Sequence, residues 1–273
     1  MQWFEEKNET FGILLNITSR EEYSSPFQKI EVLHSLQYGK ILVLDGLIQT
    51  TEKDEFIYHE MLSHIPMLAH PSAADILVIG GGDGGVVREI CKYNNTRVTL
   101  VEIDQMVIEV SLKEFPSISS ALKNDNVSII YEDGSTFIKT KKNAYDIILV
   151  DCSDPVSHSA SLFKEQFFID VKEALKHDGV FAFQSESPIA HLDFLTQTRK
   201  VLLRFFPIVK HYFAPIPTYP TGFWSFTFAS FQYQPSLNTQ TKTILQSLQT
   251  KYLNQEIYEA SFAMPDFVKQ ALQ

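Results

Sequence analysis

The first fifty or so residues are rich in short extended runs of apolar residues separated by polar and turn residues, as is typical of strands. Two extended runs, 29–35 and 40–50, are joined across Gly39 and predict a β-hairpin. The stretch 12–18 and the residues around Tyr23 predict partner strands for this hairpin. We therefore expect a small N-terminal β-domain over residues 1–53.

The period changes at Asp54, because apolar residues then recur at helical spacing up to Leu68, and Pro71 follows. Beyond this helix, five nearly continuous apolar runs alternate with helical stretches. Such runs are typical of parallel strands that are covered on both faces. The runs span 75–80, 97–104, 127–133, 145–152 and 179–186, and the helical stretches start near Gly84, Gln105, Gly134 and Ser161.

The last third of the chain completes the expected sheet. Residues 209–220 and 222–231 predict a β-hairpin that adds an antiparallel strand at one side. Residues 240–273 are interpreted as two short helices, and the polar segment 234–242 as a flexible connection. The whole pattern predicts an α/β fold, doubly wound and Rossmann-like of the methyltransferase type, with a catalytic domain over 54–273.

Composition narrows the classes of partner. The 273 residues have a formal net charge of −10, which argues against a nucleic-acid binder and mildly favours a cationic ligand. Two cysteines cannot build a disulfide framework, and the N-terminus lacks the apolar core of a signal peptide. No apolar stretch approaches the ~18 residues that span a membrane. We expect a cytoplasmic protein without nucleic-acid or membrane partners.

The most informative segment is "DILVIGGGDGGVVREI", residues 75–90. Gly80, Gly82 and Gly85 satisfy the G-x-G-x-x-G spacing that places a phosphate at a helix N-terminus. Asp83 contradicts a phosphate site, because its charge would repel the ligand. A capping role does not explain Asp83 either, because more glycine follows it.

Further carboxylates follow the other strands. Ligands of open parallel sheets bind outside the carboxyl ends of the strands, so these acids are expected to converge on one edge. They are Asp83, Glu102, Asp133, Asp151 and Asp154. Taken singly, Asp133 or Asp154 could instead be a helix N-cap.

The acids disfavour a dinucleotide. Unit charges 4 Å apart at an effective dielectric near 20 interact by roughly 4 kcal/mol, and no basic residue compensates before Arg88. A nucleoside with positive charge fits better. Glu102 could accept the ribose hydroxyls and Asp133 the adenine amino group, which leaves the other acids for cationic groups.

Several motifs resemble those of the polyamine aminopropyltransferases, the spermidine synthase family, over nearly the whole chain. They are "VLDGLIQTTEKDEFIYHEML", "VIGGGDGGVVREI", "DCSDP", "SLFKEQFF" and "PTYPTG". The resemblance implies transfer of the aminopropyl group of decarboxylated S-adenosylmethionine to a diamine, typically putrescine. The products would be spermidine and methylthioadenosine, with no cofactor. It also implies a homodimer or homotetramer, with the N-terminal β-domain as the contact.

The resemblance also implies roles for individual residues. It places Tyr58 and Asp151 nearest the attacking nitrogen, and because an alkylammonium must lose a proton before it attacks, we expect Asp151, aided by Tyr58 and a water, to accept that proton. The acceptor would bind to Tyr58, Asp151, Asp154, Gln184 and Tyr219. The donor would bind to Gln28, Gln49, His59, Asp83, Glu102, Asp133 and Gly134, with Asp83 on its ammonium group.

Alternatives stay open. Cadaverine, agmatine or spermidine could replace putrescine, and an S-adenosylmethionine methyltransferase or a non-catalytic polyamine-binding protein could share the fold. Ser157 and His158 replace a Gly-Pro pair common in the family, so loop closure could differ; His158 is a second candidate proton acceptor or an exposed loop residue. His59 and His64 are one residue too far apart for the helical zinc motif, so we expect no metal site.

Overall fold

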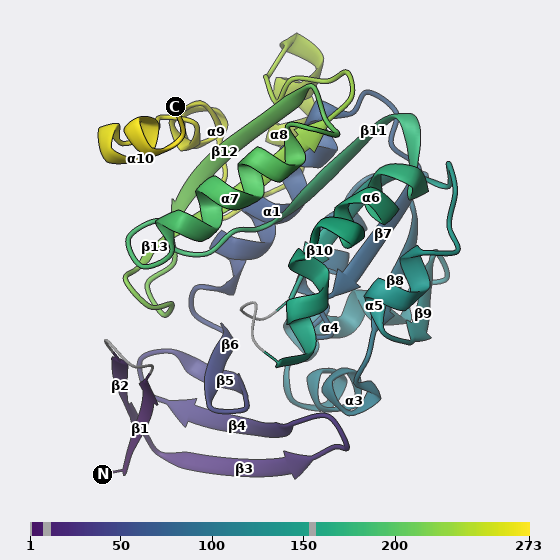
Figure 1. The fold of residues 1–273 in the computed structure, drawn as a ribbon. Coiled ribbons are helices and arrows are strands. Elements are labelled where there is room, and N and C mark those ends of the chain that lie inside the picture. Colours follow the sequence, from purple (N-terminus) through teal and green to yellow (C-terminus); the bar gives the residue numbers. More distant parts are fainter. Residues whose placement is uncertain (1, 8–11, 153–156) are drawn as a thin grey trace.

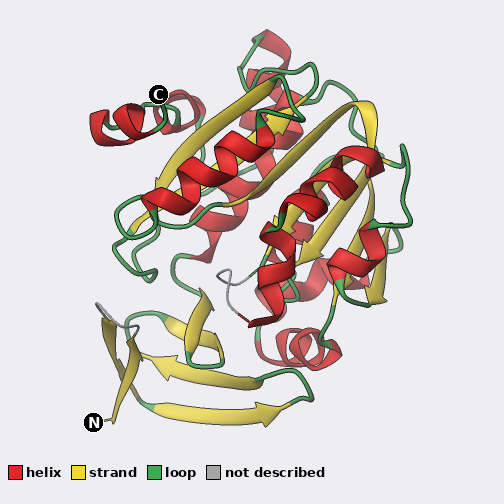
Figure 2. Cartoon of the chain, in the orientation of Figure 1, coloured by secondary structure: helices red, strands yellow, loops and turns green. Residues whose placement is uncertain are grey.

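The computed structural model describes residues 2–7, 12–152 and 157–273, with only the backbone described for 157–159. The chain forms two small sheets near its N-terminus and one large sheet covered by helices (Figures 1 and 2). The fold class predicted from the sequence is confirmed.

The N-terminal residues form two antiparallel sheets. β1 (Gln2–Lys7), which the pattern did not predict, pairs with β2 (Gly12–Ile17). The second sheet has the order β3 (Ser19–Ser24), β4 (Lys29–Ser35), β5 (Gly39–Leu44) and β6 (Leu47–Thr51). The single run expected over 40–50 was wrong. Asp45 and Gly46 both have positive φ and make a two-residue hairpin turn between β5 and β6.

The large sheet has seven strands in the order β12-β13-β11-β10-β7-β8-β9. Its five parallel strands are β7 (Asp75–Gly80), β8 (Arg97–Glu102), β9 (Val127–Tyr131), β10 (Tyr145–Asp151) and β11 (Leu175–Gln184). β12 (Ile208–Pro215) and β13 (Phe223–Ser230) form the expected hairpin, antiparallel to the rest. Strand order reverses between β7 and β10, where a ligand site is expected.

Successive residues of β7 supply two cores. Ile76 and Val78 pack on one face with α1 (Glu55–Ala69), α2 (Gly85–Ile90) and parts of the C-terminal segment. Leu77 and Ile79 pack on the other face with α5 (Gly134–Ile138) and α6 (Glu165–Ala174), and α7 (Leu192–Leu202) covers the sheet on the same side. Burial on both faces explains why the sequence shows continuous apolar runs instead of alternation.

The C-terminal segment differs from the expectation. It forms three helices, α8 (Thr239–Ser247), α9 (Gln255–Ser261) and α10 (Asp266–Ala271), where two were predicted. The segment 234–242 is not simply a connection, because Asn238 and Thr241 form a capping box that starts α8 within it. No helix among the described residues is long and apolar enough to cross a membrane.

The N-terminal four-stranded sheet packs against the helices that follow β8. These are α3 (Gln105–Glu114) and α4 (Pro116–Ser119). The 3-10 turn η1 (Ser120–Lys123) follows α4, and a second 3-10 segment, η2 (Ser157–Phe163), precedes α6. Ile30 and Val32 of β4 are buried against Val107 and Phe115. This contact holds the small sheet over the carboxyl edge of the large one (Figure 1).

Candidate active site

A pocket lies at the carboxyl ends of the parallel strands, between the large sheet and the N-terminal strands. Eleven of the twelve residues predicted for the site line it, and Asp154 lies outside the described residues. The eleven are Gln28, Gln49, Tyr58, His59, Asp83, Glu102, Asp133, Gly134, Asp151, Gln184 and Tyr219. The structure therefore brings together residues that are up to 191 positions apart (219 − 28).

The glycine loop makes room for side chains at two points. A Cβ on Gly81, whose φ is +72°, would lie 2.8 Å from Oδ2 of Asp151 on the neighbouring strand. A Cβ on Gly85 would lie 2.2 Å from two atoms of the His59 ring. In this chain the loop thus accommodates a carboxylate and an imidazole at close range.

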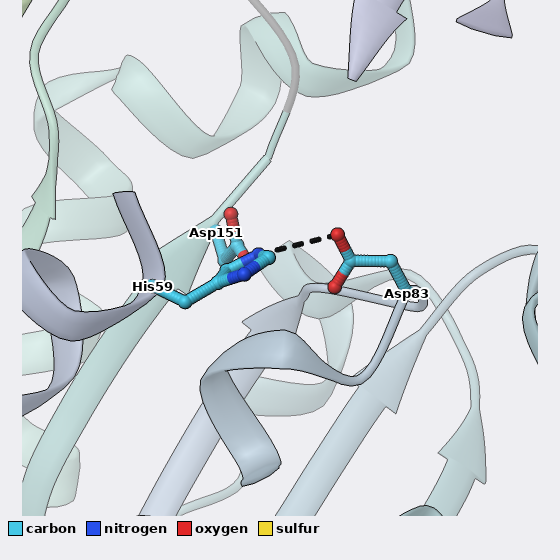
Figure 3. Close-up of side chains that lie close together, drawn as sticks. All are labelled: His59, Asp83 and Asp151. Atoms are coloured by element: carbon cyan, nitrogen blue, oxygen red, sulfur yellow. Dashed lines mark ion pairs between the residues drawn. The ribbon is translucent and has the colours of Figure 1, made fainter. Parts of the chain in front are cut away.

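Asp83 has two partners, one on each carboxylate oxygen. Oδ1 accepts the N–H of Gly85, the first residue of α2, at 2.8 Å. The N-cap of α2 is Gly84 and no side chain caps the helix, as expected, although Asp83 satisfies one N–H of the helix start. Oδ2 lies 3.2 Å from Nε2 of His59, which α1 brings to the loop (Figure 3).

His59 places a cation among the acids. Its Nδ1 lies 2.6 Å from Glu55 on the preceding turn of α1. Burial lowers the pKa of His59, but the charge of Asp83 and the bonds from Asp83 and Glu55 outweigh this, so the pKa lies well above its ordinary value. No lysine or arginine of the glycine loop accompanies these acids, but the imidazolium of His59 does. The family resemblance pointed to His59 as a site residue, whereas its charge follows only from the contacts in the fold.

His59, Asp83 and Asp151 offer ligand atoms within 4.8 Å of one another, close enough to hold a metal ion. The bonding argues for an ion pair instead. Both imidazole nitrogens face carboxylates, so both carry protons in the charged ring and neither has a lone pair for a metal.

Asp151 and Tyr58 form a second buried pair. The Tyr58 hydroxyl donates to Oδ1 of Asp151 at 2.8 Å. Burial and the nearby charge of Asp83 raise the pKa of Asp151 to about 6, although His59 and Tyr58 oppose the rise. Burial and the Asp151 charge raise the pKa of Tyr58 well above its ordinary value, so Tyr58 stays a donor. This pair can hold or accept one proton near neutral pH.

Glu102 and Asp133 mark the other end of the pocket. Glu102 accepts the N–H of Asp104 at 3.0 Å, and burial raises its pKa to about 7. Asp133 accepts the N–H of Thr136 at 2.8 Å and caps α5, so the capping alternative is confirmed for this residue. Capping leaves its position at the pocket wall unchanged.

The opposite end of the pocket is partly aromatic. Tyr219 makes edge contacts with Tyr58 and Trp224, and its hydroxyl donates to the carbonyl of Gln49 at 2.6 Å. Gln184 donates to the carbonyl of Cys152. Aromatic rings beside carboxylate and amide groups suit a chain of methylene groups that carries positive charge.

Two further carboxylates escaped the sequence analysis. Glu6 of β1 lines the pocket and accepts the N–H of Ile48 at 2.7 Å. An available signal was its place two residues after Phe4, on the inward side of a strand. Glu186 is buried beside Gln184 with a positive φ, a strained conformation that only the fold reveals.

Comparisons with known proteins give a consistent result. Residues 55–241 match the spermine/spermidine synthase domain, and residues 2–52 match the spermidine synthase tetramerisation domain. A polyamine aminopropyltransferase of Bacillus cytotoxicus is 42% identical over 270 residues, 97% of each chain. One of Alkaliphilus metalliredigens is 42% identical over 279 residues, 99% of this chain and 98% of the relative.

Solved structures agree. A spermidine synthase crystallised with the transition-state analogue AdoDATO has a TM-score of 0.94 and 34% identity, and the match covers 99% of this chain and 94% of that one. The spermidine synthase of Thermotoga maritima has a TM-score of 0.93 and 35% identity, over 100% of this chain and 94% of that one.

Proposed function

The chain belongs to the spermine/spermidine synthase family, and we propose that it transfers the aminopropyl group of decarboxylated S-adenosylmethionine to putrescine, giving spermidine and methylthioadenosine. The observation that carries the proposal is the charge of the pocket. Asp83 and Asp151 lie together in it, and among the described residues no lysine or arginine lines it. We infer that Gln28, Gln49 and Glu102 face the donor nucleoside.

The charges support selection of the donor. Decarboxylated S-adenosylmethionine is cationic at both its ammonium and its sulfonium group, and an acidic pocket stabilises both. Ordinary S-adenosylmethionine carries an additional carboxylate, which the pocket would repel. His59 is the one positive group among the described residues of the pocket wall, and its ring nitrogens are bonded to Glu55 and Asp83. A methyltransferase function is therefore disfavoured.

The nucleophile must lose a proton before it attacks, because an alkylammonium has a pKa near ~10. We propose that Asp151 accepts this proton through a water, while Tyr58 fixes the carboxylate. Nitrogen then attacks the methylene carbon next to sulfur, and the sulfonium leaves as a neutral thioether. Alignment of nitrogen, carbon and sulfur within the pocket supplies much of the rate.

An acceptor panel tests the proposal. The purified protein is given decarboxylated S-adenosylmethionine with putrescine, cadaverine, agmatine or spermidine, and release of methylthioadenosine is measured. We expect putrescine to have the highest kcat/KM, by about tenfold over cadaverine, since one methylene is worth ~1–3 kcal/mol. A better alternative acceptor contradicts the acceptor assignment. Absence of release with every amine, or preference for carboxylated donor in competition, contradicts the activity.

We also propose a homodimer or homotetramer in the cytoplasm. The match of residues 2–52 to a tetramerisation domain supports assembly through the N-terminal strands, where Trp3 and Leu14 are exposed. Cys91 and Cys152 form no disulfide in the described part of the chain, as suits a reducing compartment. Light scattering after size exclusion, with wild type and Trp3→Ser, tests the assembly.

A further inference from the structure

His59 lies in a socket built by residues that do not themselves line the pocket. We propose that Glu55 and Arg88 are positioning residues for the proposed reaction: they hold the His59 ring so that its Nε2–H fixes the Asp83 carboxylate for the donor's ammonium group. The inference rests on the proposed function for its effect on catalysis, whereas the socket itself can be measured without any substrate.

A continuous series of charged contacts leads from α2 to the pocket. Arg88 binds Glu55 with both terminal nitrogens, Nη1 to Oε1 at 2.9 Å and Nη2 to Oε2 at 2.8 Å. Glu55 Oε2 contacts Nδ1 of His59 at 2.6 Å, and Nε2 of His59 contacts Asp83 at 3.2 Å. The Glu55 side chain is 4% exposed and that of His59 is 3% exposed, so water does not compete for the bond between Glu55 and His59.

The opposite wall of the socket is the backbone of the glycine loop. Gly85 leaves space for the imidazole, since any Cβ there would overlap the ring. The ring is therefore confined on one side by Gly85 and oriented by Glu55 at Nδ1. With these restraints the Nε2–H of His59 is directed at Asp83.

The charges around His59 sum to a small surplus. Glu55 and Tyr58 face it from α1, Asp83 from the loop and Asp151 from β10, with Arg88 behind Glu55. With Tyr58 neutral and Asp151 ionised, three carboxylates surround His59, and the charge of Arg88 is shared between Glu55 and Glu89. The cluster therefore keeps a negative surplus for an incoming ammonium group. If His59 were neutral, the surplus would be larger, and burial would drive the carboxylates to take up protons.

The same helix contains a natural control. His64 lies further along α1, fully buried, with Nε2 2.9 Å from Glu89. Glu89 also accepts from Nε of Arg88 at 2.9 Å. This second histidine–glutamate pair resembles the first in burial and bonding, but neither member lines the pocket.

The experiment compares Glu55→Gln, Arg88→Lys and the control His64→Gln in the full-length protein. Donor KM, putrescine KM and the pH dependence of kcat/KM are measured, and His59 is titrated by ¹⁵N NMR without substrate. We expect Glu55→Gln to raise donor KM about 10- to 100-fold, as for loss of a buried charge-assisted bond, with a much smaller change for putrescine. The His59 titration should move to lower pH, because Glu55 no longer favours the charged ring.

Arg88→Lys should give a smaller change in the same direction, because lysine keeps the charge but not the two-point contact. It also keeps the test decisive if Glu55→Gln does not fold. His64→Gln should lower the melting temperature and change donor KM much less than Glu55→Gln does, because His64 reaches the socket only through Glu89 and Arg88. The proposal is overturned by a neutral His59 at pH 7 in the wild type, by an unchanged donor KM and titration in both socket variants, or by the same change in the control. Failure of the proposed function has a different signature: the wild type transfers nothing to putrescine, while His59 still titrates as a bonded imidazolium.

Discussion

Acidic residues lie at both the amino and the carboxyl ends of the strands of the large sheet, but their charged partners differ. At the amino edge, Asp75 of β7 contacts Arg97 at 2.6 Å and Lys176 at 2.8 Å. Asp146 of β10 contacts the same lysine at 2.9 Å and accepts two backbone N–H groups. At the carboxyl edge the same two strands lead to Asp83 and Asp151, and among the described residues the only cation in the pocket wall is His59.

The pKa values reflect this contrast. Burial opposes ionisation of both Asp75 and Asp146. For Asp75 this is outweighed by Lys176 and Arg97, and for Asp146 by two backbone N–H groups and Lys176, so both pKa values are lowered. At the other edge burial prevails for Asp151, whose pKa rises to about 6, and for Glu102, whose pKa rises to about 7. Asp83 differs, because His59 outweighs burial and lowers its pKa. The acids of the amino edge are neutralised within the fold, whereas Asp151 and Glu102 keep their capacity for a cationic ligand.

Matched substitutions at the two edges should separate these roles most strongly. Asp151→Asn should lower kcat about 10²- to 10⁴-fold, because the proton acceptor is lost, with little cost in stability. Asp146→Asn should leave kcat within about twofold and lower the free energy of unfolding by roughly 1–3 kcal/mol. Steady-state kinetics and urea unfolding of both variants test this. Near-normal turnover of Asp151→Asn would remove Asp151 from the mechanism.

Acid should affect the contribution of Asp151 to stability and that of the two amino-edge acids in opposite senses. The folded pKa of Asp151 exceeds its unfolded value, so its contribution to stability increases as pH falls from about 6 to about 4. Asp75 and Asp146 have folded pKa values below their unfolded ones, so they stabilise the fold at pH values above the unfolded pKa. This stabilisation is lost as pH falls below about 4.

Carboxyl ¹³C titration of the free protein measures these pKa values directly. We expect a midpoint near 6 for Asp151 and midpoints below the ordinary aspartate range for Asp75 and Asp146. Adding methylthioadenosine with putrescine should lower the Asp151 midpoint, because a cation then faces it. An Asp151 midpoint below 4 in the free protein would remove the contrast between the edges.

The smallest effect is expected for the lysine that joins the amino-edge acids. Lys176→Gln should reduce the free energy of unfolding by roughly 1–2 kcal/mol, because Asp146 then keeps only its backbone donors. Donor and putrescine KM values should not change, since Lys176 lies at the far edge of the sheet. A marked change in either KM would show that the two edges are coupled.

Local pattern predicted much of the fold. The five parallel strands were found because burial on both faces leaves continuous apolar runs, although β11 starts four residues before the expected position (179 − 175). The turn at Asp45-Gly46 and the start of α8 were missed, although Asp-Gly and the Asn238 cap are local signals. β1 was missed because its alternation covers only six residues.

For the site, the sequence by itself determined which acids follow the strands, because a parallel sheet brings its carboxyl ends to one edge whatever the details of packing. It also carried the family motifs, and the family assignment is confirmed. Only the tertiary structure decided the charge state of the site. His59 and Glu55 come from a helix that precedes the sheet, and Glu6 comes from the first strand. Arg88 of α2 binds Glu55 on the side away from the pocket. Their pKa values and hydrogen bonds depend on burial and on distances of a few ångströms between segments far apart in the chain, which sequence spacing does not encode.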